Sequence, residues 1–297
     1  MEGSIFDIKN GFQRGNIVTR LIYINVLVFL FFALVGIFLT LFNVGYNPWA
    51  RYFELPAWVP TFLLQPWSLI TYMFMHVDLF HILFNMLWLY WFGTLFLNFF
   101  SSRHLRGLYV LGGIGGGLLY MLAYNIFPYF SLTSHHALLL GASASILAIV
   151  VATAVRQPEY IVQFMFVGAV RLKYVALFMI VTDLLFMTHG NAGGHISHLG
   201  GALTGWLFAS HLSNGRDITA WINKVIDWFS FDRKVCFRRK PKMKVHYGDK
   251  QKDYNYNARR KADNDEIDRI LDKLRKSGYG SLSEEEKKTL FNASQRN

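Results

Sequence analysis

The chain has 297 residues, of which 53% are hydrophobic, 17% aromatic and 16% charged, whereas about a quarter of the residues of an average soluble domain are charged. Its net charge of +11 is concentrated at one end, because residues 214–297 hold 21 of the 30 Lys and Arg and 13 of the 19 Asp and Glu. The single cysteine, Cys236, excludes a disulfide within the chain and a metal site built from paired thiolates. This composition argues against an ordinary soluble globule.

The first apolar run predicts a membrane span over residues 19–43. Glu2 and Asp7 interrupt the basic segment that a cleavable signal would carry, and the run is too long for a signal. We therefore expect residues 1–18 to be a cytoplasmic segment that stays on the chain. The following stretch, 44–78, contains four prolines and many aromatic residues, which is typical of a loop that lies in the membrane interface.

Uncharged apolar runs predict further spans along the chain. No Asp, Glu, Lys or Arg occurs from Leu79 to Ser102 or in the 49 residues from Gly107 to Val155, and runs of about 18 or more apolar residues are candidate transmembrane helices. With helix-ending residues as boundaries, we expect six spans, over 19–43, 79–100, 107–127, 137–155, 174–189 and 195–212. Together they form a membrane-embedded core over residues 19–212.

The distribution of basic residues predicts the orientation of these spans. Lys and Arg occur in the N-terminal segment, after the second and fourth spans and in the tail, whereas the opposite connections contain only Arg51. By the positive-inside rule, both termini are cytoplasmic. The second, fourth and sixth spans then enter from the outer side, and positions three to eight residues into them lie about 5 to 12 Å below the outer boundary.

Polar residues of the second and fourth spans fall at this depth. His81 and Asn85 are one helical turn apart on one face, so that their donors can point to a common spot, and His76 precedes them. Gly141 and Ser143 stand near the start of the fourth span. Taken singly, each also has a plain structural interpretation as an interfacial polar group or a packing residue.

The sixth span contributes a histidine and a stripe of small residues. His198, Gly201 and Gly205 fall on one helical face, and the two glycines permit close contact with a facing helix. The fourth span has a matching stripe, which consists of Ala144, Ala148 and Ala152. If the stripes pack, Ser143 and His198 meet, and imidazole is the usual base that makes serine a nucleophile. We expect His195 to be interfacial.

These motifs resemble those of the rhomboid family of intramembrane serine proteases. The similarity covers roughly residues 60–212 and consists of HxxxxHxxxN from His76, GxSx from Gly141 and HxxGxxxG from His198, together with a glycine cluster in the third span. It implies an all-α membrane protein with a six-transmembrane-helix rhomboid-like bundle in the bacterial inner membrane. The implied substrates are transmembrane proteins with small residues at the cut, and no cofactor or metal is implied.

The resemblance also implies residue roles. Ser143 is the nucleophile and His198 the general base, and His81, Asn85 and the backbone N–H of Ser143 form the oxyanion hole. His76, Gly141, Gly201 and Gly205 are structural residues near the site. Neither Asp78 nor Asp183 stands at a spacing that would clearly orient His198, so we expect a Ser-His dyad rather than a triad. Ala144 and Leu147 depart from the family, which usually has glycine and an aromatic residue there.

The sequence of the C-terminal tail, residues 213–297, predicts a linker followed by a small module. Residues 213–262 form a basic juxtamembrane linker, with an amphipathic segment over 218–229 and a basic run over 233–244 suited to anionic lipid headgroups rather than nucleic acid. We expect 245–262 to be flexible and 263–297 to form a small cytoplasmic helical hairpin, with a capping box at Ser283 and Glu286. The partner of this module is not identified by the sequence.

Three alternative functions remain open from the sequence. The first is a catalytically inactive rhomboid-like protein that binds membrane helices without cleaving them. The second is a metal-dependent membrane enzyme that uses His76, His81, His195 and His198 as ligands, although no acidic ligand or HExxH motif accompanies them. The third is a transporter, whose usual internal repeat is not evident.

Overall fold

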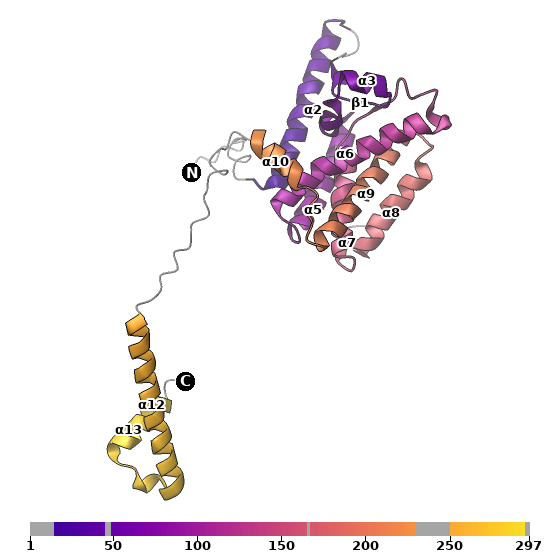
Figure 1. Cartoon of the computed structure of the whole chain (residues 1–297). Coiled ribbons are helices and arrows are strands. Elements are labelled where there is room, and N and C mark those ends of the chain that lie inside the picture. Colours follow the sequence, from indigo (N-terminus) through magenta and orange to yellow (C-terminus); the bar gives the residue numbers. More distant parts are fainter. Residues whose placement is uncertain (1–14, 45–48, 165–166, 230–249, 295–297) are drawn as a thin grey trace. The chain divides into compact units, whose positions relative to one another are not determined.

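The computed structural model describes residues 15–44, 49–164, 167–229 and 250–294, and the chain divides into two compact units, residues 1–232 and 233–297 (Figure 1). The first unit is a bundle of α-helices and the second contains a pair of helices. The predicted all-α fold class is therefore confirmed.

Within the described residues, each predicted span corresponds to one helix. These helices are α2 (Ile17–Leu41), α5 (Leu79–Leu97), α6 (Ser102–Ile126), α7 (Ser143–Arg156), α8 (Leu172–Phe186) and α9 (Ala192–Ser213). Of these, α2, α5 and α6 are long and apolar enough to cross a membrane, and α7 is a shorter apolar helix. Four of the helices begin at a side-chain cap that accepts a backbone N–H, and the caps are Asn16, Asp78, Ser101 and Asn191.

The predicted interface loop contains short elements of its own. These are η1 (Ala50–Tyr52), β1 (Leu55–Pro56), α3 (Val59–Leu64), α4 (Ser68–Thr71) and η2 (Tyr72–Phe74). β1 pairs antiparallel with β2 (Leu138–Leu139), which follows η3 (Pro128–Phe130). The expectation of a helix from residue 137 is therefore wrong for its first six residues, because a strand and a turn precede α7. A second antiparallel hairpin, β3 (Ile161–Phe164) and β4 (Gly168–Arg171), joins α7 to α8.

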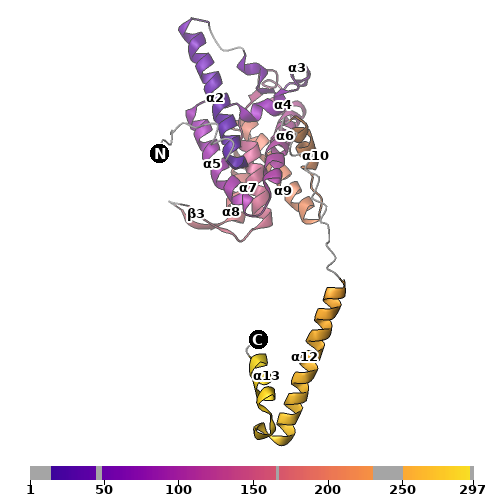
Figure 2. The same ribbon diagram turned by 90° about the vertical axis from the view of Figure 1, so that its left-hand side faces the viewer.

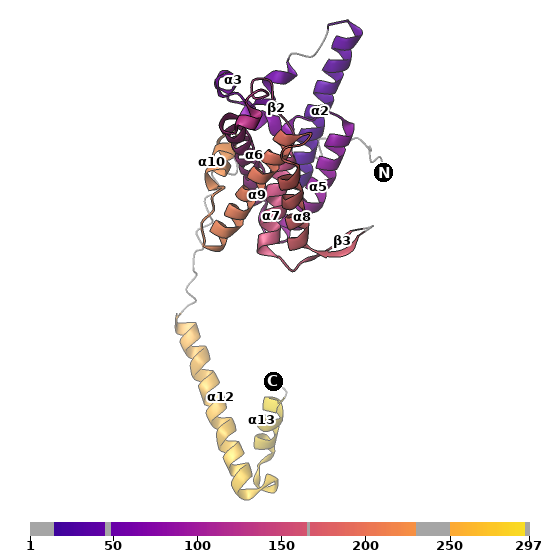
Figure 3. The same ribbon diagram turned by 90° about the vertical axis from the view of Figure 1, so that its right-hand side faces the viewer.

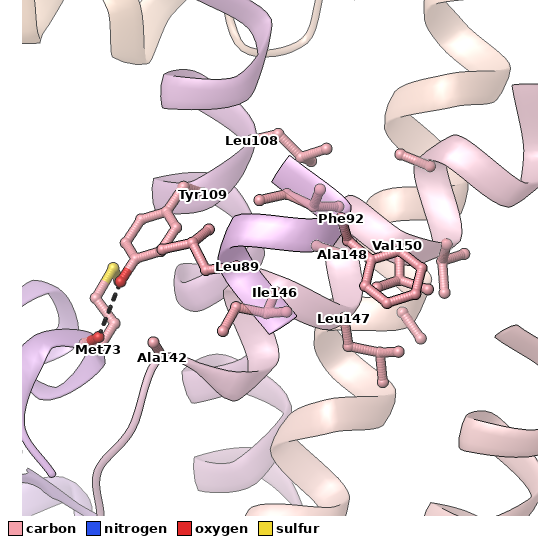
Figure 4. Packing of buried hydrophobic residues seen from close by; sticks show 14 of the residues in the cluster. Met73, Leu89, Phe92, Leu108, Tyr109, Ala142, Ile146, Leu147, Ala148 and Val150 are labelled. Atoms are coloured by element: carbon pink, nitrogen blue, oxygen red, sulfur yellow. Dashed lines mark hydrogen bonds between the residues drawn. The ribbon is translucent and has the colours of Figure 1, made fainter. Parts of the chain in front are cut away.

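Helix α7 lies at the centre of the bundle, between α5, α6, α8 and α9 (Figures 2 and 3). Every residue from Ala144 to Ala154 is buried. Figure 4 shows the apolar side chains of α7 packed with Leu89 and Phe92 of α5 and with Leu108 of α6. Nearby, the Tyr109 hydroxyl donates a hydrogen bond of 3.1 Å to the Met73 carbonyl. The core of this unit is thus built around the helix that begins with Ser143.

Small residues bring α6, α7 and α9 into close contact. A β-carbon on Gly205 would lie 2.2 Å from the Ala148 carbonyl oxygen, and one on Gly112 of α6 would lie 2.5 Å from the Ala148 β-carbon. Both distances are far inside van der Waals contact, so glycine is required at each position. The predicted packing of the two small-residue stripes is confirmed.

The predicted amphipathic segment of the linker is the helix α10 (Ala220–Phe229), which packs on the start of α6. The Asp227 carboxylate pairs with Arg103 and Arg106 at 2.8 Å each. The Asn223 amide donates to the Arg103 carbonyl oxygen at 3.0 Å. Polar side chains therefore attach α10 to the bundle.

The second unit contains α12 (Lys250–Ser277), η4 (Tyr279–Ser281) and α13 (Glu284–Ser294). The expected flexible stretch and the boundary at residue 263 are wrong for residues 250–262, which form the first turns of α12. The predicted capping box is present, since the Ser283 backbone N–H donates to Glu286 and the Ser283 hydroxyl accepts from the Glu286 N–H. The basic run over 233–244 lies outside the described residues.

Candidate active site

The position of Ser143 is set by the turn that precedes α7. Gly141 has φ of +121°, a conformation that residues with a β-carbon rarely adopt, and its N–H donates to the Tyr72 carbonyl at 2.9 Å. Ser143 is the first residue of α7, and the N–H groups of a first helical turn have no acceptor within the helix. These N–H groups and the positive end of the helix dipole lie next to the Ser143 hydroxyl and favour negative charge there.

His198 lies opposite Ser143 on α9. The distance between His198 Nε2 and Ser143 Oγ is 2.7 Å, which is a strong hydrogen bond. Both side chains are half-buried. The close approach of α7 and α9 at the small-residue stripes therefore brings together two residues that are 55 positions apart in the sequence.

Asp183 of α8 lies on the other side of His198. Its Oδ1 is 2.8 Å from His198 Nδ1 and 2.9 Å from His195 Nδ1, and its side chain is only 8% exposed. The expectation that no acidic residue orients His198 is therefore wrong for Asp183. Asp78, by contrast, caps α5 and accepts the His81 backbone N–H at 2.8 Å.

One feature of the sequence does indicate a function for Asp183, although its spacing from His198 does not. It is the single charged residue in the predicted span 174–189, and an ionisable residue inside a membrane segment is costly enough to indicate a function. His195, expected to be interfacial, instead shares the same carboxylate.

The imidazole of His81 lies beside Gly141, close to Ser143. A β-carbon on Gly141 would lie 3.0 Å from His81 Nε2 and 3.8 Å from Ser143 Oγ. His81 Nδ1 accepts the Val77 backbone N–H at 3.5 Å. A neutral imidazole that accepts at Nδ1 carries its proton on Nε2, so the nitrogen near Gly141 is a donor.

Asn85 and His76 flank His81. The buried Asn85 amide donates to the His81 carbonyl oxygen at 2.8 Å, which leaves its second amide proton for another acceptor. The ring centroids of His76 and His81 are 5.0 Å apart, edge to face. Burial, together with a smaller effect of the nearby His81, lowers the pKa of His76 to about 4. His76 is therefore a neutral packing partner for His81 at physiological pH.

Residues 63–215 match the family described as Rhomboid domain. The chain belongs to the rhomboid family. Within the curated proteins, this rhomboid is similar to RHOMBOID-like protein 12, mitochondrial, of Arabidopsis thaliana, with 30% identity over 158 residues. The alignment covers 50% of this chain and 47% of the relative, so the chain spans about half the length of the relative it matches. Residues 250–296 match a second family, a family of unknown function designated DUF6576.

The two departures of this rhomboid from the family pattern are both buried. Ala144 and Leu147 are each 1% exposed. A β-carbon on Gly116 of α6 would lie 2.6 Å from the Ala144 methyl group, so this methyl points towards α6. It therefore occupies space that Gly116 leaves free.

The metal-ligand group expected as an alternative, His76, His81, His195 and His198, differs from the cluster that forms. Among the described residues, the ligand atoms of Asp183, His195 and His198 lie within 4.8 Å of one another. Direct hydrogen bonds between the carboxylate and both imidazoles account for this proximity. The geometry is that of an oriented general base.

Proposed function

We propose that this rhomboid is an intramembrane serine endopeptidase that hydrolyses peptide bonds in or near the transmembrane segments of other membrane proteins. The observation that carries the proposal is the 2.7 Å hydrogen bond between Ser143 Oγ and His198 Nε2 at the start of α7. A hydroxyl that donates to an imidazole is an activated nucleophile, and the N–H groups of the first turn provide the electrostatic stabilisation that acyl transfer needs.

The first half of the reaction forms an acyl-enzyme. Ser143 Oγ attacks the carbonyl carbon of the scissile bond while His198 Nε2 takes the hydroxyl proton. The oxyanion that develops accepts hydrogen bonds from the Ser143 backbone N–H, from His81 and from Asn85, and each such donor contributes about 10²- to 10³-fold in rate. The imidazolium of His198 then gives its proton to the departing amine, and the C–N bond breaks.

The second half regenerates the enzyme. His198 takes a proton from a water molecule, whose oxygen attacks the acyl ester of Ser143, and then returns this proton to the serine oxygen as the ester bond breaks. Ser143 and His198 are only half-buried, which is compatible with the access of water that this step requires. No cofactor or metal takes part in this scheme.

Fold and charge distribution suggest where the reaction occurs. We place the protein in a bacterial inner membrane. Its termini are cytoplasmic in this proposal, because the connections on the same side as the termini carry most of the Lys and Arg. The relative from Arabidopsis thaliana is named as mitochondrial. Transmembrane proteins with small residues at the cut are the proposed substrates, and membrane lipids are the surroundings of α2 and of the exposed faces of α5 and α8.

The experiment that tests the proposal measures cleavage of a single-pass test substrate in proteoliposomes, together with labelling by a fluorophosphonate. We expect the wild type to cut and to be labelled at Ser143, and Ser143→Ala and His198→Ala to do neither. Insensitivity to chelators would further separate the serine mechanism from a metal-dependent one. A folded wild type that neither cuts nor reacts would contradict the proposal and favour a rhomboid-like protein that binds helices without cleavage.

A further inference from the structure

Asp183 is a buried carboxylate that the Ser-His mechanism does not use. It is provided by α8, a helix separate from those that carry Ser143 and His198, and its Oδ1 contacts the Nδ1 atoms of both His198 and His195. A charged group in such a position is costly unless it is fully hydrogen-bonded. A carboxylate in this mostly apolar helix is therefore expected to have a function.

The contact determines which nitrogen of His198 carries the proton. An ionised carboxylate can only accept hydrogen bonds, so that Nδ1 of His198 must donate to it. In the neutral imidazole, Nε2 is then unprotonated and accepts the Ser143 hydroxyl proton. This is the tautomer that a general base requires, and the alternative tautomer would direct an N–H group at the Ser143 hydroxyl.

The carboxylate also acts during the reaction. When His198 has taken the serine proton, it is an imidazolium, and Asp183 lies 2.8 Å from its other nitrogen. A fixed negative charge at that distance stabilises the imidazolium in a site of low polarity. This interaction is stronger in the transition state than in the ground state, so it raises kcat rather than lowering KM.

His195 completes the arrangement. Its Nδ1–H is a second donor to the same Oδ1, and it stands three residues before His198 on α9, one turn away on the same face. The second hydrogen bond fixes the carboxylate in place and offsets part of its burial cost.

We infer that Asp183, anchored by His195, is the positioning residue that holds His198 in its base-competent tautomer, so that this rhomboid operates as a Ser-His-Asp system. The inference rests on the proposed protease function. It extends that function with a residue from α8 that neither the motifs nor the resemblance assigned.

The test compares full-length variants in proteoliposomes. Asp183→Asn preserves shape, but its amide can donate to His198 Nδ1 and so favour the wrong tautomer; we expect kcat to fall by about 10²- to 10⁴-fold with little change in KM. Asp183→Glu, which restores a carboxylate, should recover part of this loss. The control is Asn25→Leu, which removes another buried polar side chain, hydrogen-bonded to Tyr109 in the bundle, and should lower thermal stability while kcat is retained.

A second measurement is made on the wild type, and a variant serves only to assign its signal. Solid-state NMR of the wild type with ¹⁵N-labelled histidine reports which ring nitrogen of each histidine is protonated, and His198→Asn assigns the signal. A neutral His198 with its proton on Nδ1 supports the inference, and a proton on Nε2 overturns it. Equal kcat values for Asp183→Asn and the wild type also overturn it. An inactive wild type would instead overturn the protease function itself, so the two failures are distinguishable.

Discussion

The carbonyl oxygen of Ala144 faces Gly201 so closely that a β-carbon on this glycine would lie 2.1 Å away. The obstructing atom belongs to the backbone of α7, one residue after Ser143, and cannot rotate aside. The spacing of α7 and α9 therefore depends on the absence of a side chain at residue 201. The distance between Ser143 and His198 depends on this spacing.

Gly201→Ala is therefore expected to separate the two helices and to reduce the reactivity of Ser143. Overpacking of this kind costs about 1 to 3 kcal/mol in stability, and we expect labelling of Ser143 to fall by more than tenfold because each ångström of misplacement is costly to catalysis. Thermal unfolding and fluorophosphonate labelling measure the two effects. The matched control is Gly36→Ala in α2, where nothing lies within 4 Å of the new β-carbon. Equal labelling of the two variants would contradict this view of the helix contact.

Gly141→Ala tests the turn before Ser143. The substitution would strain a backbone with φ of +121° and place a methyl group 3.0 Å from His81 Nε2, so kcat should drop by about 10²-fold, the loss expected for one displaced oxyanion donor. Gly168→Ala is the control, because this glycine of β4 has φ of +84° but nothing within 4 Å. If both variants lose activity equally, backbone strain alone is responsible and the contact with His81 is irrelevant.

Asp227→Asn tests the attachment of α10 to the bundle. The substitution removes the charge that pairs with Arg103 and Arg106, and partly exposed pairs of this kind contribute up to about 1 kcal/mol. Hydrogen exchange should become faster in α10, with little change in α7. The control is Glu159→Gln, whose carboxylate also pairs with two basic residues, Arg171 and Lys173. If hydrogen exchange in α10 is unchanged in Asp227→Asn, the apolar contacts of α10 are sufficient to hold it on the bundle.

His76 is expected to make the stability of the folded protein depend on pH. Its pKa is lowered to about 4 in the folded protein by burial, compared with about 6.5 in an unfolded chain. Between these values the unfolded state binds more protons, so stability is lost as the pH falls from about 6.5 to about 4. Thermal unfolding of the wild type and of His76→Gln from pH 7 to pH 4 measures this, and the variant should show the shallower dependence. Parallel curves would assign the acid sensitivity to other groups.

The sequence predicted the contacts of the site that follow from the residue pattern of a single helix or of one small-residue stripe. The spans, the small-residue stripes on α7 and α9 and the resulting approach of Ser143 to His198 all follow from helical periodicity and from the lack of side chains at Gly201 and Gly205. Asp183 could not be placed in this way, because periodicity does not fix the rotation of α8 about its axis relative to α9. Three-dimensional information was therefore needed to add the residue from α8, Asp183, to the site.

The two largest boundary errors have different physical reasons. The start of α7 was predicted too early, since the apolar run from residue 137 continues through β2 and the Gly141 turn without a change in composition. The start of α12 was predicted too late, because its first turns are polar, and polar residues with good helix propensity give no apolar periodicity by which a helix is recognised.

The length of α7 has a consequence for biosynthesis. Its 14 residues extend about 21 Å, less than the roughly 30 Å of a bilayer's hydrocarbon core, so this helix is a weak candidate for independent insertion during translation. Its burial by neighbouring helices makes its stable insertion depend on them, and α9 is the last of these to be synthesised. The segment that carries Ser143 is therefore expected to settle in the membrane only after translation has passed Ser213, and substitutions that delay this step would reduce the yield of inserted protein before they affect catalysis.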